Sequence, residues 1–365
     1  MHKYFSFFAI AALFLCLHGA IHAQTMLSDT LEYANLRNKI RDQEFFLKLD
    51  SNNTNALLKR ALYKLQMRDF EGAILDNTRV LKIDAKISDA WANRGWCKFE
   101  LHDFNGAIFD INRSIELSPL DAMGYLNRAY VKCEYKDYKG SIEDNSIAIG
   151  LRPDYAKAFC NRGVSEERSG DSLGALHDFN KAIEINPVYF EAYTNRGILK
   201  CALKDYPGSI ADHTIAIELF PGMFASYDGR GMAKWNSGDR KGAMEDFNKS
   251  LEINPNFSMG FCNRGRLKAE LKDHKGGLKD LDIAVKLDAK EKFAYSNRAY
   301  VKSLLKDYKG AIDDLTKLIQ LEPDNPANYI GRAEMYLKAK MKDKAKFDYA
   351  MAESLKTKKE NKDKK

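Results

Sequence analysis

The 365-residue chain contains 45% hydrophobic and 30% charged residues, which are globular values and exclude extended disorder or a collagen-like structure for most of it. Its net charge of +7 is unevenly distributed: residues 356–365 contribute six lysines against two acidic residues, and Lys3 contributes one more positive charge. The rest of the chain therefore has a charge of only +2. A body so close to neutral lacks the electrostatic basis for binding nucleic acid.

The N-terminal residues have the pattern of an export signal. A short basic start is followed by an almost continuously apolar run over residues 4–17, and the small residue Ala23 offers a cleavage position. This run is shorter than the ~20 residues that a membrane-spanning helix needs. We therefore expect a signal peptide over residues 1–23, cleaved near Ala23, and an exported protein in the periplasm or the medium. The alternatives are an uncleaved anchor and lipidation at Cys16, which the bulky Leu15 disfavours.

Export would place five cysteines in an oxidising compartment. Their number is odd, no two form a C-x-x-C pair, and the closest two are 27 residues apart, which excludes zinc-finger and thioredoxin motifs. We expect small thiols that are buried or line a groove, without an essential disulfide. These cysteines are Cys97, Cys133, Cys160, Cys201 and Cys262.

An internal repeat of 34 residues dominates the rest of the chain. Arginine recurs at this interval at positions 60, 94, 128, 162, 196, 230, 264, 298 and 332, and aspartate recurs at positions 76, 110, 144, 178, 212, 246, 280, 314 and 348. Such a period indicates stacked supersecondary units. It defines nine units without insertion or deletion: 54–87, 88–121, 122–155, 156–189, 190–223, 224–257, 258–291, 292–325 and 326–359.

The unit 88–121 shows the local physics. Its first half has a helical periodicity that places Trp91 and Gly95 on one face. A turn follows, where Asp103 is placed to cap a second helix with an apolar stripe. Pro119 then ends this helix. Each unit is therefore predicted to be a helix–turn–helix.

The aromatic-x-x-x-Gly start, a small residue such as Ala107 on the second helix and the closing proline together resemble the tetratricopeptide repeat. The resemblance implies an all-α fold, a right-handed superhelical solenoid of nine such repeats, and a scaffold that binds proteins or peptides. The chain departs from the family pattern by placing arginine where leucine usually precedes the glycine, and by Met341 and Gly277 at a cap and a packing position. Residues 24–53 have the phase of a half-repeat that would cap the first unit, and 360–365 form a lysine-rich tail.

The arginine and aspartate columns are level with each other across the predicted hairpin, because Arg94 and Asp110 lie eight residues on either side of His102. We therefore predict a charge-assisted pair between the two helices of each unit. A basic strip that binds a ligand is the functional alternative.

A column of asparagines lies about 200° around the first helix from the aromatic column, at 3.6 residues per turn. If the aromatic residues face the core, the asparagines face away from it. In superhelical members of the family such an asparagine ladder holds an extended peptide through its backbone, and the resemblance implies the same role here. The alternative is a solvated polar face. The column consists of Asn93, Asn127, Asn161, Asn195, Asn263 and Asn297, interrupted at Gly229.

Two further columns on this face vary from unit to unit, as a binding surface on a repeat scaffold should. We predict that four aromatic residues in them are anchors for the bound peptide, because aromatic residues dominate interface energetics. Packing against the adjacent repeat is an equal alternative for Val164 and Ile198. The predicted anchors are Trp96, Phe99, Tyr130 and Trp235.

No pattern of enzyme chemistry is present in the sequence. The histidines after residue 23 form no metal-spaced pair, and no phosphate loop, nucleophile elbow or dinucleotide fingerprint occurs. We expect no catalytic residue, no metal and no cofactor. The predicted function is a non-enzymatic adaptor that holds an extended segment of a partner in a concave groove. The alternatives are a structural subunit of an envelope complex and an accessory subunit of a cell-wall or export enzyme.

Overall fold

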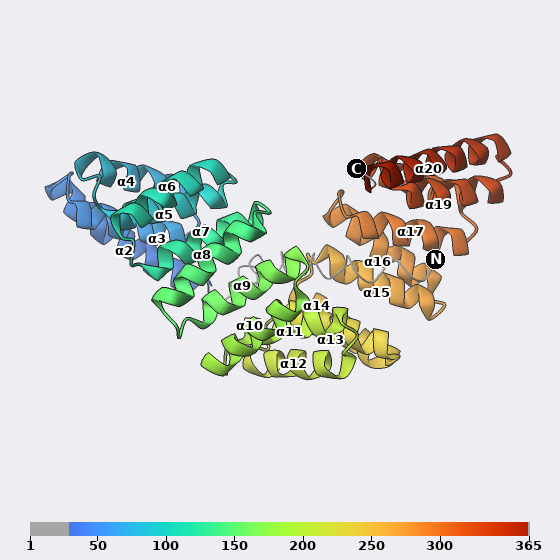
Figure 1. Cartoon of the computed structure of the whole chain (residues 1–365), viewed down its shortest axis with the longest axis horizontal. Coiled ribbons are helices and arrows are strands. Elements are labelled where there is room, and N and C mark those ends of the chain that lie inside the picture. Colours follow the sequence, from blue (N-terminus) through green and yellow to red (C-terminus); the bar gives the residue numbers. More distant parts are fainter. Residues whose placement is uncertain (1–28, 364–365) are drawn as a thin grey trace. The chain divides into compact units, whose positions relative to one another are not determined.

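The computed structural model describes residues 29–363, and every regular element in this range is a helix (Figure 1). The predicted signal peptide lies outside the described residues. From α3 onward, first and second helices alternate in about nine helix pairs. The predicted all-α array of tetratricopeptide-like helix–turn–helix units is confirmed.

The described residues form two compact units. The N-terminal unit contains residues 29–203 with 218–220, and the C-terminal unit contains residues 204–217 with 221–363. The helices of the first are α2 (Asp29–Leu49), α3 (Thr54–Gln66), α4 (Phe70–Ile83), α5 (Ser88–Glu100), α6 (Phe104–Leu117), α7 (Ala122–Glu134), α8 (Tyr138–Leu151), α9 (Ala156–Ser169), α10 (Ser172–Ile185) and α11 (Phe190–Ala202). Those of the second are α12 (Tyr206–Leu219, its last two residues excepted), α13 (Phe224–Ser237), α14 (Arg240–Ile253), α15 (Ser258–Glu270), α16 (His274–Leu287), α17 (Lys292–Leu304), α18 (Tyr308–Leu321), α19 (Pro326–Lys338) and α20 (Lys342–Asp363).

The second helices from α4 to α18 each begin at an aspartate cap that recurs in the sequence. In α6 the side chain of Asp103 accepts a hydrogen bond from the backbone N–H of Gly106 at 2.9 Å, which satisfies a donor that has no partner within the helix. A Cβ added at Gly106 would lie only 2.1 Å from Asp103 Oδ2. The aspartate cap therefore also explains why glycine recurs three residues after it.

Close contact between the two helices of a pair depends on small residues. Ala107 of α6 is fully buried, and a Cβ added at Gly95 of α5 would lie 2.9 Å from Ile111 Cγ1 and 3.1 Å from the Ala107 carbonyl oxygen. No larger side chain fits between these backbones without displacing α6. The glycine and alanine columns thus set the spacing of the hairpin. The unpaired helix α2 packs against α3.

The arginine and aspartate columns meet in bidentate ion pairs. Arg162 donates from Nε to Asp178 Oδ2 at 2.6 Å and from Nη2 to Asp178 Oδ1 at 3.0 Å. The same two bonds occur in all eight hairpins whose two helices both belong to the N-terminal unit or both to the C-terminal unit. The aspartates of these pairs are buried. The predicted structural pair is confirmed, and it accounts for the arginine column without a ligand.

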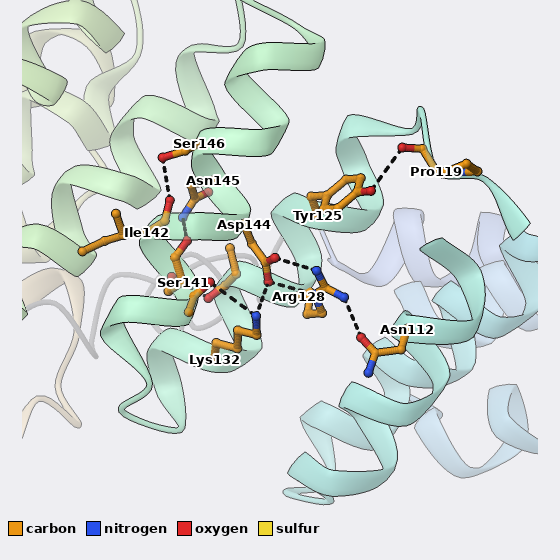
Figure 2. A network of polar contacts seen from close by, with 12 residues as sticks. Asn112, Pro119, Tyr125, Arg128, Lys132, Ser141, Ile142, Asp144, Asn145 and Ser146 are labelled. Carbon is orange, nitrogen blue, oxygen red and sulfur yellow. Dashed lines mark hydrogen bonds and ion pairs between the residues drawn. The ribbon is translucent and has the colours of Figure 1, made fainter. Parts of the chain in front are cut away.

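In every repeat after the first, the third donor group of the arginine reaches the preceding repeat. Figure 2 shows Arg128 of α7 between Asp144 of α8 and Asn112 of α6, to which its Nη1 donates at 2.7 Å. Equivalent bonds run from Nη1 to Thr78, Ser146, Asn180, Thr214, Asn248, Asp282 and Thr316. One guanidinium therefore joins three helices and couples adjacent repeats.

A lysine four residues after the arginine usually completes the network. Lys132 Nζ lies 2.8 Å from Asp144 Oδ2 (Figure 2). The same contact is made by Lys64, Lys98, Lys234, Lys268 and Lys302. In α9 the register holds Glu166 instead of lysine.

Replacing one arginine tests how much this ion-pair network contributes to the stability of the array. We expect Arg162→Ala to lower the free energy of unfolding by ~3–5 kcal/mol, because it leaves the buried Asp178 without a cation. Arg128→Ala is the matched control and should cost less, since Lys132 still neutralises Asp144. Urea unfolding of both variants measures the difference. Equal losses would show that the lysine contributes nothing.

Candidate functional site

Three of the predicted ladder asparagines lie at one register on α5, α7 and α9, and these consecutive first helices contact one another in the N-terminal unit. Asn93, Asn127 and Asn161 are partly buried. Within residues 29–363 their side-chain amides make no hydrogen bond to the protein. A carboxamide donates and accepts, so each can bond a peptide group supplied from outside.

The other three asparagines are already bonded. Asn195 donates from Nδ2 to Cys160 Sγ at 3.4 Å, and Asn297 donates to Cys262 Sγ at 3.1 Å. Asn263 donates to both carboxylate oxygens of Asp228, at 3.1 and 3.2 Å. In each case the acceptor lies 35 residues earlier, on the preceding first helix.

This corrects the expectation that the whole column faces away from the core. Asn195 and Asn263 are only 5% and 7% exposed. The reason is that successive first helices lie close together. The asparagine amide of one helix therefore reaches the residue that precedes the asparagine register on the helix before it. In this part of the column the asparagines hold repeats together.

The interruption of the column at Gly229 has a packing reason. A Cβ there would lie 2.4 Å from Cε1 of His213, so an asparagine cannot fit. His213 is fully buried, and burial lowers the pKa of its imidazole to about 4, which keeps the ring neutral. Sequence reasoning missed this pair. Its signal was a histidine at the register where other second helices have Ile111 or Phe179.

Asp228 is a second buried group that the sequence analysis missed. It is fully buried, and burial raises the pKa of its carboxyl to about 7 against the opposing effect of the Asn263 hydrogen bond. Cysteines occupy its register in α9 and α15, at Cys160 and Cys262. The carboxyl thus replaces a thiol as the acceptor for a ladder asparagine.

Three of the four predicted aromatic anchors gather in one cluster on α5 and α7. The ring centroids of Trp96 and Phe99 are 5.4 Å apart, those of Trp96 and Tyr130 5.5 Å, and those of Phe99 and Tyr130 5.4 Å. All three are partly buried. Because such tilted and edge-on contacts hold the rings rigid, the cluster presents a preformed apolar surface.

Charged side chains border this aromatic cluster. Arg168 of α9 donates to Glu134 Oε1 at 2.9 Å and contacts Cys133 Sγ at 3.3 Å. Burial and then the nearby Glu134 and Glu100 raise the pKa of the Tyr130 hydroxyl, which therefore stays protonated. The cluster has an apolar centre and a polar rim.

The fourth predicted anchor lies in the C-terminal unit. Trp235 of α13 donates from Nε1 to Glu270 Oε2 at 2.6 Å and packs edge-on against Phe247. Of the two variable positions with a packing alternative, Ile198 is buried and Val164 is partly buried. Burial of Ile198 agrees with the packing alternative for that residue.

All five cysteines are free and buried, as expected. In residues 29–363 no group of three or more histidine, cysteine or acidic side chains is arranged to hold a metal ion. None of the helices described is both long and apolar enough to cross a membrane.

Comparison with known proteins agrees with this geometry. Residues 224–257 and 294–325 match the family model described as tetratricopeptide repeat. These two segments, and the all-helical array of which they are part, are tetratricopeptide-like. Repeats of this type generally serve as scaffolds for protein interaction. No curated protein matches the sequence.

Two solved structures share this all-helical repeat fold. One is the hetero-tetramer Cut9-Hcn1 of APC/C, with a TM-score of 0.62 and 15% identity over 81% of this chain. This chain spans only 58% of the length of that one. The other is a tetratricopeptide repeat protein from Parabacteroides merdae, with a TM-score of 0.57, 16% identity, and coverage of 68% of this chain and 98% of that one. At such identities the likeness concerns the fold alone.

Replacing Asp228 by cysteine tests the buried carboxyl. A pKa raised in the folded state means that the carboxyl costs no stability below its ordinary range and costs progressively more as the pH rises through about 7. Asp228→Cys should therefore be nearly neutral in acid but raise the free energy of unfolding by about 1–3 kcal/mol well above neutrality. Urea unfolding under reducing conditions at both pH values measures this.

Asn263→Ala is the control, because removing this hydrogen-bond donor from the carboxyl should steepen the pH dependence. The same pH dependence in wild type and Asp228→Cys would contradict the assignment.

Proposed function

We propose that this protein is a non-enzymatic scaffold that binds an extended peptide segment of a partner protein across α5, α7 and α9. The observation that supports this most is the pairing of unbonded carboxamides with an aromatic cluster on the same consecutive helices. Asn93 precedes Trp96 by three residues, and Asn127 precedes Tyr130 by three, so each pair shares a helix face.

The two groups of residues have different tasks. A hydrogen bond contributes a net ~0.5–1.5 kcal/mol, so three asparagine amides fall short of the ~8 kcal/mol of micromolar binding. The aromatic cluster of Trp96, Phe99 and Tyr130 must supply the remainder by burying an apolar side chain of the peptide. The amides then set its direction and register, and the cluster sets its specificity.

The proposal places the peptide on the N-terminal unit. There the side-chain amides of Asn93, Asn127 and Asn161 have no hydrogen-bond partner among residues 29–363, so both their donor and their acceptor groups can bond a peptide. In the C-terminal unit Asn263 and Asn297 already donate within the array, and Gly229 provides no amide. Trp235 is a separate anchor for any second segment bound there.

We also propose that the protein acts outside the cytoplasm. The basis is the pattern of residues 1–23, with a basic start, an apolar run and Ala23 at the cleavage position. N-terminal sequencing of the protein recovered from the extracytoplasmic fraction tests this. A first residue of Gln24 supports the proposal, and recovery of the intact chain from the cytoplasm contradicts it.

Asparagine variants test the binding site. A peptide selected from a phage-displayed library of random short peptides on the wild-type protein serves as the probe, titrated by fluorescence polarisation. The double variant Asn127→Ala/Asn161→Ala should bind it at least ~10-fold more weakly, which corresponds to about 1.4 kcal/mol. Its melting temperature should be unchanged, because neither amide has a partner within the described residues.

Two further variants separate binding from folding. Trp96→Ala should also weaken binding by removing the apolar anchor. Asn195→Ala should lower the melting temperature, because it removes the bond to Cys160 between two repeats. Unchanged affinity in the double variant would identify these asparagines as solvated surface.

A further inference from the structure

The lysine register of the array has one acidic exception. In six other repeats the lysine that follows the arginine by four residues places a second cation on the buried aspartate, as Lys132 does at 2.8 Å from Asp144, whereas α19 has the neutral Tyr336 there. In α9 this position is Glu166. The fourth repeat therefore has a carboxyl group at the position where the preceding repeat places a lysine against its buried aspartate.

The surroundings of Glu166 leave its charge poorly compensated. Its side chain is 15% exposed, and Oε2 is buried without a hydrogen-bond partner in the described part of the chain. Arg162 Nε is 3.9 Å from Glu166 Oε1 but is already bonded to Asp178. Asp171, the cap of α10, adds a further negative charge nearby. One guanidinium thus faces two carboxyl groups, Glu166 and Asp178.

A proton resolves this conflict. Arg162 Nε lies 2.6 Å from Asp178 Oδ2 and 3.9 Å from Glu166 Oε1, so both carboxyl groups face the same N–H. Two ionised carboxylates are both acceptors and cannot bond each other. One proton between them supplies the missing donor and removes one negative charge. In agreement, burial and then Asp178 raise the pKa of Glu166 to about 7, against the lowering effect of Arg162.

We propose that Glu166 and Asp178 share one proton, and that this pair makes the α9–α10 hairpin a pH-sensitive joint of the array. The hairpin is held firmly in mild acid and loosens above neutrality. Arg162 also donates to Ser146 of α8, so loosening extends to the contact with the preceding repeat. The inference does not depend on peptide binding.

The sign follows from linkage. Because the pKa of Glu166 is raised in the folded state, its contribution to stability is complete below the ordinary carboxyl range and is lost as the pH rises through about 7. In a repeat array each unit contacts only its neighbours, so the loss should remain local. Asp228 of the C-terminal unit titrates in the same range, and a global melt alone cannot separate the two groups.

Amide hydrogen exchange on the full chain, read by mass spectrometry and corrected for the intrinsic effect of pH, gives the local resolution required. We expect protection in peptides from α9 and α10 to fall severalfold between about pH 5.5 and 8.5, while α7 and α8 change little. Glu166→Lys restores the lysine of the other repeats, and Glu166→Gln keeps a permanent neutral donor. Both variants should abolish the pH dependence in α9 and α10.

Lys132→Glu is the reciprocal variant and should transfer the pH dependence to α7 and α8. If it fails to fold, the two Glu166 variants decide alone. A fall in α9–α10 protection that is the same in wild type, Glu166→Lys and Glu166→Gln overturns the proposal, and so does wild-type protection in α9–α10 that does not change with pH.

Discussion

The buried aspartate of each second helix is the constraint on which the rest of the array depends. A carboxylate excluded from water is costly unless it is paired and hydrogen-bonded, and here the arginine of the first helix provides two bonds in fixed geometry. The same guanidinium donates to the preceding second helix. One interaction thus orients the hairpin and couples it to its neighbour, which explains why arginine stands where the repeat family usually has leucine.

Departures from the regular columns are where individual properties arise. Glu166 replaces a lysine, Asp228 replaces a thiol, and His213 fills the space that Gly229 leaves. Each places a titratable group among residues that elsewhere are apolar or ion-paired, and burial shifts its pKa toward the neutral form. The regular columns build the scaffold, and these three departures place buried titratable groups in particular repeats.

The asparagine column shows how one residue type serves two purposes. In α5, α7 and α9 its amides make no hydrogen bond to the described part of the chain and lie beside an aromatic cluster, which favours recognition of a peptide. In α11, α15 and α17 its amides tie successive first helices together. The difference depends on whether the preceding helix offers an acceptor, a thiol or a carboxylate, at the facing position.

The sequence by itself determined the hairpins, the caps, the arginine–aspartate pairs and the free cysteines. These depend on contacts within one 34-residue period, such as Arg94 with Asp110, and repetition makes their phase unambiguous. Only the tertiary structure decided which asparagine amides are hydrogen-bonded within the array and which are not. It alone also decided that Trp96, Phe99 and Tyr130 meet, and that Glu166 lies near Asp178 without a cation of its own. These contacts depend on how closely adjacent helices approach each other and on which side chains then compete for the space between them. A period in the sequence does not encode the distance between adjacent helices.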